Sequence, residues 1–400
     1  MISPTELCTK VQSSEKDTMF SICSLIHGEI FAITNIPRNL PITININSGK
    51  IGLLMDLENY APDFAPDMML GDEDNIYVLE LSGHRLMHVS MLDRKIQYYQ
   101  INCHKEDWGN FAAFVQYRNT LYAFPTYLDK MVKISFKSQN AQLAWREYPI
   151  NKKNKESIKQ EDDLEYFICG CQMGDKVWLF QRKGRLAVSY NMESGTWEQY
   201  EMPLEINDCA HTISYGEQIY ILNAEGKVYA FEPQGMCLDE IADCSDEKAD
   251  GGAFSRLAVT DKNIYLLPSL GSDIFILDIN TREIKRYESY PEGFKYCAPE
   301  GWSKFHGYCE DEDHYYYAMR SMNFFLAINK RSGKERWIKL NFPTSRQYQD
   351  LYIKYNRSML QESLCSMKEV LDSLKHPILD SENIGSTIAG VKIWEQMSLD

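Results

Sequence analysis

The sequence predicts an all-β fold built from a four-stranded unit that repeats seven times. Three observations support this prediction. Aromatic residues are abundant, with 25 Tyr, 17 Phe and 7 Trp, and aromatic side chains fit the pleated, half-buried surface of a strand. An aliphatic–aromatic pair recurs along the chain, and similar polar turns, most of them with a glycine, follow apolar segments at several places.

The recurring pair defines the period of the repeat. Its copies are Ile30-Phe31, Ile76-Tyr77, Leu121-Tyr122, Val177-Trp178, Ile219-Tyr220, Ile264-Tyr265 and Tyr315-Tyr316. They recur about every 45 residues, with insertions before the fourth and seventh copies. Around Tyr220 the segments HTISYG, QIYILN and VYAFEP are separated by short turns, and a more ragged segment completes the unit. Each pair is therefore expected in the second of four strands.

The stretch FFLAINKRSGKERW, residues 324–337, is one copy of the third strand and its exit turn. Its relatives are ITININSGKI from Ile42, LAVSYNMESGTW from Leu186 and IFILDINTREI from Ile274. Repeats of this length with four strands are typical of a β-propeller, in which each blade packs against two neighbours. We expect a seven-bladed propeller over residues 19–342, preceded by an N-terminal segment, 1–18. Six or eight blades are the alternatives if an end segment is misjudged.

The repeats also resemble known propeller families. GKVYAFEPQG (Gly226–Gly235) and LAINKRSGKERW (Leu326–Trp337) resemble the third-strand and turn motif of PQQ-like repeats, and the tyrosine-then-tryptophan rhythm is similar to kelch-like repeats. The resemblance implies the fold and not an activity. No residue matches a motif that contacts a quinone, so we expect no cofactor. The Gly-Gly pair of kelch repeats is also missing.

Charge and cysteine usage narrow the class of protein. The formal net charge is −15, which disfavours broad nucleic-acid binding, because phosphate neutralisation needs a basic face. The N-terminus shows no secretory signal, and no apolar run is long enough to span a membrane. The 11 Cys are scattered rather than arranged as a disulfide framework. These features together predict a cytoplasmic protein.

Two insertions and a tail interrupt or follow the repeats. Residues 150–165 and the acidic stretch Asp239–Asp250 are expected to be exposed loops. In residues 343–400 the apolar positions Leu360, Leu364, Met367, Leu371 and Leu374 follow helical spacing. This spacing predicts a C-terminal helical extension, which either packs on the propeller or serves for docking or self-association.

Cations recur where the second strand of a blade turns into the third. These residues are Arg38, Arg85, Lys130, Arg185, Lys227 and Arg320. In an acidic protein, a ring of cations near the mouth of the central channel would attract an anionic ligand. The alternative is that a cation at this turn belongs to the repeat pattern and has a structural role.

The expected entries into the first strands carry a second set of candidates. These residues are Trp108, Asn110, Tyr166, Asp208, His211, Arg256 and Trp302. Large aromatic faces beside polar groups suit sugar rings or peptide side chains. Aromatic residues at blade entries also serve as packing residues, and both interpretations stay open at this point.

No nucleophile elbow, phosphate-binding loop or dinucleotide fingerprint is present, and no histidine pair has metal-ligand spacing with a third ligand. Asp208, Cys209 and His211 are the best constellation for catalysis, but three such neighbours rarely converge on an extended strand. We therefore expect a non-catalytic scaffold that binds a protein or peptide partner on the channel face. The alternative is a carbohydrate or small-anion propeller, either lectin-like or a lyase or hydrolase.

Overall fold

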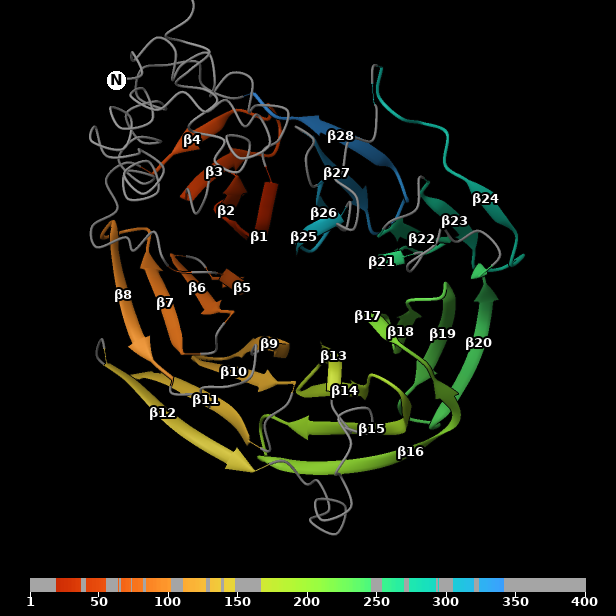
Figure 1. The fold of residues 1–400 in the computed structure, drawn as a ribbon, viewed down its shortest axis with the longest axis horizontal. Coiled ribbons are helices and arrows are strands. Elements are labelled where there is room, and N and C mark those ends of the chain that lie inside the picture. Colours follow the sequence, from red (N-terminus) through yellow and green to blue (C-terminus); the bar gives the residue numbers. More distant parts are fainter. Residues whose placement is uncertain are drawn as a thin grey trace, which may run out of the picture.

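The computed structural model describes residues 19–36, 41–54, 64, 66–72, 74–81, 84–101, 111–126, 130–137, 140–147, 167–245, 254–269, 273–292, 294, 305–319 and 324–341. These residues form seven four-stranded antiparallel sheets arranged in a ring, with the first strand of each sheet nearest the axis and the fourth outermost (Figure 1). The predicted seven-bladed β-propeller is confirmed. The expected segment 1–18 and the expected helical extension 343–400 lie outside the described residues. Within the described part, no helix has the length and apolar character of a membrane span.

Every blade consists of four strands that are consecutive in the chain. Blades 1 and 2 contain β1 (Met19–Ile26), β2 (Glu29–Ile36), β3 (Pro41–Asn45), β4 (Ile51–Leu53), β5 (Pro66–Gly71), β6 (Asn75–Glu80), β7 (Arg85–Ser90) and β8 (Lys95–Gln100). Blades 3 and 4 contain β9 (Phe111–Tyr117), β10 (Thr120–Pro125), β11 (Lys130–Lys137), β12 (Asn140–Glu147), β13 (Phe167–Met173), β14 (Lys176–Gln181), β15 (Gly184–Asn191) and β16 (Thr196–Ile206).

The remaining three blades follow the same order. Blades 5 and 6 contain β17 (Cys209–Tyr215), β18 (Gln218–Asn223), β19 (Lys227–Glu232), β20 (Cys237–Asp243), β21 (Phe254–Val259), β22 (Asn263–Pro268), β23 (Phe275–Asp278) and β24 (Ile284–Arg286). Blade 7 contains β25 (Phe305–Glu310), β26 (His314–Met319), β27 (Phe324–Asn329) and β28 (Glu335–Lys339). The prediction that Asp239–Asp250 forms an exposed loop was therefore wrong in part. The strand β20 runs to Asp243, and Leu238 of this strand is buried in the core.

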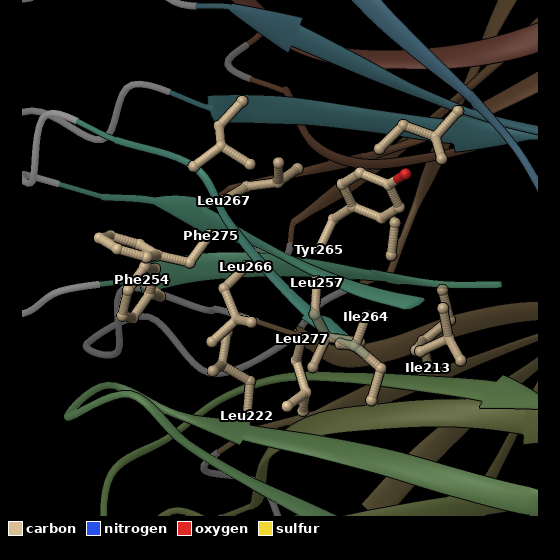
Figure 2. Close-up of a cluster of buried hydrophobic side chains, with 14 of the residues drawn as sticks. Ile213, Leu222, Phe254, Leu257, Ile264, Tyr265, Leu266, Leu267, Phe275 and Leu277 are labelled. Atoms are coloured by element: carbon tan, nitrogen blue, oxygen red, sulfur yellow. The ribbon is translucent and has the colours of Figure 1, made fainter. Parts of the chain in front are cut away.

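The recurring aliphatic–aromatic pair lies in the second strand of every blade, as the period predicted. The second strand of blades 2 to 7 is half-buried at its first residue and buried at the next five. Such continuous burial means that both faces of the strand are covered, which is the pattern of a sheet packed between two others. Figure 2 shows this packing, where Leu222 of blade 5 meets Leu266 and Leu277 of blade 6 in one apolar cluster.

The predicted turn between the third and fourth strands is held by an Asx or similar side chain. Asn45, Asn191, Asp278 and Asn329 each place Oδ1 where it accepts backbone N–H groups two or three residues further on. The fifth residue of each turn then adopts a positive φ, which glycine tolerates best. These positions are Gly49, Gly195, Arg282 and Gly333. The sequence motif thus encodes the turn directly.

The ring is closed between blades 1 and 7, each of which uses only its own strands. A parallel bridge joins Lys50 to Asn341, and the Asn341 N–H donates to the Gly49 carbonyl at 2.8 Å. One buried cluster spans both blades and includes Ile30 and Phe325. Closure therefore depends on side-chain packing and on a close approach of the β3–β4 turn to the end of β28.

Substituting Gly49 tests this closure. Gly49 has a φ of +67°, and a Cβ there would collide with the Lys339 carbonyl oxygen of blade 7. We expect Gly49→Ala to lower the free energy of unfolding by at least about 3 kcal/mol, from backbone strain plus displacement of blade 7. Urea unfolding measures this loss.

Gly28→Ala in the same blade is the matched control. Gly28 has a φ of +72°, and a Cβ there would have open space around it. Only the backbone strain applies, so the expected loss is about 1 kcal/mol. Equal losses for the two variants would contradict the proposed seam.

Candidate functional site

Several of the strands nearest the axis are less buried than the strands beside them. All six residues of β5 are half-buried, whereas β6 beside it is buried over five residues. The later parts of β13 and β17 are also half-buried. Innermost strands can retain exposed surface only if solvent reaches them along the axis. The burial pattern therefore indicates an internal opening lined by the first strands.

Each first strand has a β-bulge near its start. In blade 5, Cys209 pairs with Asn223 and His211 pairs with Leu222, so that Ala210 is skipped. Blades 2, 3, 4 and 6 skip one residue at the same position, namely Asp67, Ala112, Ile168 and Ser255. Bulges redirect the side chains that follow them and are frequent beside functional sites. The same bulge thus recurs at the end of the ring where the chain enters each blade. We call this end the entry end.

Two skipped residues also tie neighbouring blades together. The Phe111 N–H of blade 3 donates to Asp67 Oδ2 of blade 2 at 3.2 Å. Ser255 Oγ of blade 6 donates to the Phe305 carbonyl of blade 7 at 3.3 Å. Burial raises the pKa of Asp67 to about 7, and the hydrogen bond from Phe111 opposes this rise. These contacts connect blade 2 to blade 3 and blade 6 to blade 7 at the entry end.

His211 and Arg256 occupy the position directly after the bulge in two adjacent blades. The Leu257 N–H donates to His211 Nδ1 at 3.4 Å. Burial lowers the pKa of His211 well below its usual value, and the positive charge of Arg256 lowers it further. Because Nδ1 is the acceptor, the neutral ring carries its proton on Nε2.

Arg256 lies close to the axis. Its Nη1 donates to the Ser255 carbonyl at 2.8 Å. Burial lowers its pKa, and its electrostatic neighbours include Cys169 of blade 4 and Cys23 of blade 1. Because these neighbours belong to blades on different sides of the ring, the Arg256 side chain must extend toward the centre.

Tyr308 of blade 7 completes the group. Its ring lies edge-on to the His211 ring, with centroids 5.8 Å apart. Its hydroxyl is closed off from solvent, and the Glu310 carboxylate lies near it. Burial raises its pKa well above the usual value, and the nearby carboxylate of Glu310 adds to the rise. We call His211, Arg256 and Tyr308 the axial donor cluster.

The three residues that were considered for catalysis do not converge. Asp208 is exposed and accepts a hydrogen bond from Arg182 Nε at 2.7 Å. Cys209 is buried against blade 4, and a hydrogen bond with Cys169, together with burial, raises its pKa. His211 faces blade 6 instead. Among the described residues no group of three His, Cys, Asp or Glu side chains could hold a metal ion.

Three of the predicted turn cations are described with their side chains, and each has a partner in its own blade. Arg85 Nη2 contacts Glu80 Oε1 at 2.5 Å, and the guanidinium lies over the Phe64 ring. Arg185 Nε donates to the Met202 carbonyl at 2.8 Å, and Lys227 Nζ contacts Glu240 at 3.1 Å. The structure therefore does not bring these three side chains together, and the anion-binding role of this set stays a prediction.

The other predicted site residues are only partly described. Lys130 begins β11, but its side chain is outside the described part. Arg38, Arg320, Trp108, Asn110 and Trp302 lie outside the described residues. Sequence reasoning missed Asp67, Arg182 and Tyr308. The basic turn Gln181-Arg182-Lys183-Gly184-Arg185 was a visible signal for Arg182, but nothing in the sequence marked Tyr308.

Comparison with known proteins identifies the fold. No protein-family model and no curated protein matches the sequence. A catalytically inactive virginiamycin B lyase from Staphylococcus aureus, solved with quinupristin, gives a TM-score of 0.56 at 12% identity over 77% of this chain and 94% of that chain. PorZ, a surface component of the type-IX secretion system of Porphyromonas gingivalis, gives 0.53 at 10% over 82% and 38%. Hsv2 from Kluyveromyces lactis gives 0.51 at 7% over 81% and 100%. At these identities the likeness establishes the propeller fold alone, which confirms the fold-level resemblance read from the repeats.

Removing the Arg85 charge tests its structural role. The Glu80 side chain is 7% exposed and would be left buried without its cation. We expect Arg85→Met to lower the free energy of unfolding by about 3 kcal/mol. The exposed pair of Arg118 and Glu193 offers a control, and Arg118→Met should leave stability unchanged within error. Equal effects would contradict a structural role for Arg85.

The raised pKa of Asp67 predicts that the protein loses stability as this carboxyl ionises. Its pKa is raised from 3.8 to about 7, so the folded protein holds this proton more tightly than the unfolded chain. The stability from Asp67 is complete below 3.8 and is lost as the pH rises through about 7. Asp67→Asn, whose amide oxygen can still accept from Phe111, should therefore be more stable than the parent by at least about 1 kcal/mol at about pH 8.

Unfolding curves at several pH values measure this difference. The advantage of Asp67→Asn should disappear well below pH 3.8, where the parent carboxyl is protonated in both states. Glu217→Gln, at an exposed turn, is the control and should run parallel to the parent. A constant difference across the pH range would exclude a buried, titrating Asp67.

Proposed function

We propose that this protein is a non-catalytic propeller that recognises a protein or peptide partner at the entry end. The observation that carries the proposal is an exposed basic turn in an acidic chain. Arg182 and Lys183 lie between β14 and β15, Arg185 is the second residue of β15, and Arg182 contacts Asp208 at the entry of blade 5. A positively charged turn on an otherwise acidic protein favours binding of an acidic segment of a partner.

The way in which the blades are connected supports recognition at this end. The connections from one blade to the next, as well as the second-to-third-strand turns, lie at the entry end of an antiparallel blade. The connection before β17 consists only of Asn207 and Asp208, whereas those before β13 and β25 span 148–166 and 287–304. Connections of such unequal length on a rigid frame are typical of binding surfaces.

The chemistry of the inner strands supports a binding role rather than catalysis. Burial raises the pKa of the Cys171 thiol to about 12 and lowers that of His211. Both groups are thereby held in their uncharged forms. A thiol of this kind is a poor nucleophile, because the thiolate is the reactive species.

A carbohydrate-binding or anion-binding propeller is the second candidate. The axial donor cluster favours it, because its N–H and O–H groups could bind the oxygen atoms of such a ligand. Docking or self-association through residues 343–400 and a cytoplasmic location are also part of the proposal. They rest on the sequence patterns given above.

Affinity capture with charge-reversed variants tests the main proposal. Arg182→Glu with Lys183→Glu should reduce recovery of specific partners about tenfold relative to the parent chain, since two attractive contacts become repulsive. Arg331→Glu with Lys334→Glu is the matched control, because these exposed residues lie on a turn at the opposite end. Quantitative mass spectrometry of the full-length chains gives the ratios. Equal recovery by both variants would contradict recognition at the basic turn.

A further inference from the structure

We propose that Asp67 of blade 2 binds one primary ammonium group at the entry end of the axis. The ammonium group belongs to a free small amine or to a lysine side chain. The inference goes beyond the proposed partner recognition, because it concerns another blade and a ligand of the opposite charge. It rests on the contacts of the Asp67 carboxyl, on its position in the ring and on the charges around it.

The Asp67 carboxyl lacks a counter-ion in the described part of the chain. It accepts a hydrogen bond at Oδ2 from the Phe111 N–H at 3.2 Å, and no described cation forms an ion pair with it. Its pKa responds to burial and to this one hydrogen bond. Buried carboxylates are normally paired, as Glu80 of the same blade is with Arg85. Asp67 therefore has an unused capacity for a cation.

The bulge that contains Asp67 does not require an acidic residue. The same bulge in four other blades skips Ala112, Ile168, Ala210 and Ser255. Alanine occupies the position in two of these blades, so a side-chain carboxyl is unnecessary for the local backbone geometry. The repeat thus provides its own comparison. It shows that the carboxyl of Asp67 is an addition in blade 2 that the shared architecture does not explain.

Solvent reaches Asp67 from the axis. All six residues of β5 are half-buried, and Asp67 is the second of them. The chain enters β5 at the entry end, so Asp67 lies near the opening rather than deep in the ring. Its side chain is therefore buried enough to raise the pKa and still accessible to a ligand. Ionisable groups with this combination are typical of binding sites.

The strands packed against β5 leave the charge of Asp67 uncompensated. These strands are β1, β6 and β9, and β1 and β9 contain no charged residue. The titratable residues of the three strands are Cys23, Tyr77, Glu80 and Tyr117. Glu80 is neutralised by Arg85. Above about pH 7, Asp67 is thus an ionised carboxylate without a cation, and a bound ammonium group would supply the missing positive charge.

The contacts of the carboxyl favour an ammonium group over a guanidinium. A guanidinium pairs with a carboxylate through two parallel hydrogen bonds, which engage both oxygens. Oδ2 of Asp67 already accepts from the Phe111 N–H, which leaves Oδ1 for the ligand. An ammonium group is a compact charge whose donors radiate from one nitrogen. It can therefore pair with Oδ1 alone.

Carboxyl ¹³C NMR of the full-length protein with labelled aspartate tests the proposal. The Asp67 signal is assigned by its loss in Asp67→Asn and in Asp67→Glu. The probe for a free amine is methylammonium, and tetramethylammonium is its control, because it has the same charge but no N–H donor. The probe for a lysine side chain is a short capped peptide with one central lysine. Its control is the same peptide with acetyl-lysine.

We expect methylammonium, or the lysine peptide alone, to bind and to lower the pKa of Asp67, because the ligand selects the ionised form. A probe at about ten times its dissociation constant should lower this pKa by about one unit. Asp67→Asn should weaken binding about tenfold or more. Glu217→Gln, at an exposed turn of the opposite end, should bind like the parent. The pKa change is measured in the parent chain, so it stays informative if Asp67→Asn fails to fold.

Three results would overturn the proposal. The first is that neither methylammonium nor the lysine peptide changes the pKa of Asp67. The second is equal binding to the parent and to a folded Asp67→Asn variant. The third is an equal effect of tetramethylammonium and methylammonium, which would contradict binding through N–H donors. The basic turn at Arg182 takes no part in these outcomes, so they are distinguishable from a failure of the proposed function.

Discussion

The contact between the first and last blades is the constraint on which the rest of the structure depends. Neither blade borrows a strand from the other end of the chain, so closure relies on a shared apolar cluster and on the approach of Gly49 to Lys339. Because blades bury their faces against neighbours, an open ring would expose the faces of blades 1 and 7. Closure also sets the distance between the first strands, and thus which side chains face one another at the axis.

The closed ring gives the axis its chemistry. Side chains from blades 5, 6 and 7 meet where water is scarce but not absent, and burial is the leading cause of the pKa shifts of His211, Arg256 and Tyr308. Desolvation keeps the histidine neutral and the tyrosine protonated. Each of these two uncharged groups therefore keeps one hydrogen-bond donor, the ring N–H of the histidine and the hydroxyl of the tyrosine. Partner binding at the basic turn and ligand binding at the axial donor cluster are therefore compatible in one molecule.

Much of the fold could be predicted because each blade repeats the same local signals. The pair at Tyr220 and the turn after Asn329 depend on residues close in sequence, and both were found where the period placed them. The site was harder to predict, since a bulge such as that at Ala210 depends on strand register. The partners of Lys227 come from a fourth strand that lacks a clear period. Tyr308 was not predicted as a site residue, because the bulge before it skips two residues rather than one.

The central claim is that the axis presents hydrogen-bond donors, and the protonation of His211 tests it most directly. Two-dimensional ¹H–¹⁵N NMR of the imidazole, assigned by comparison with His211→Asn, reports both charge and tautomer. At about pH 6 we expect a neutral ring with its proton on Nε2, although an exposed histidine would be largely charged there. An imidazolium at that pH, or a neutral ring with its proton on Nδ1, would contradict the account.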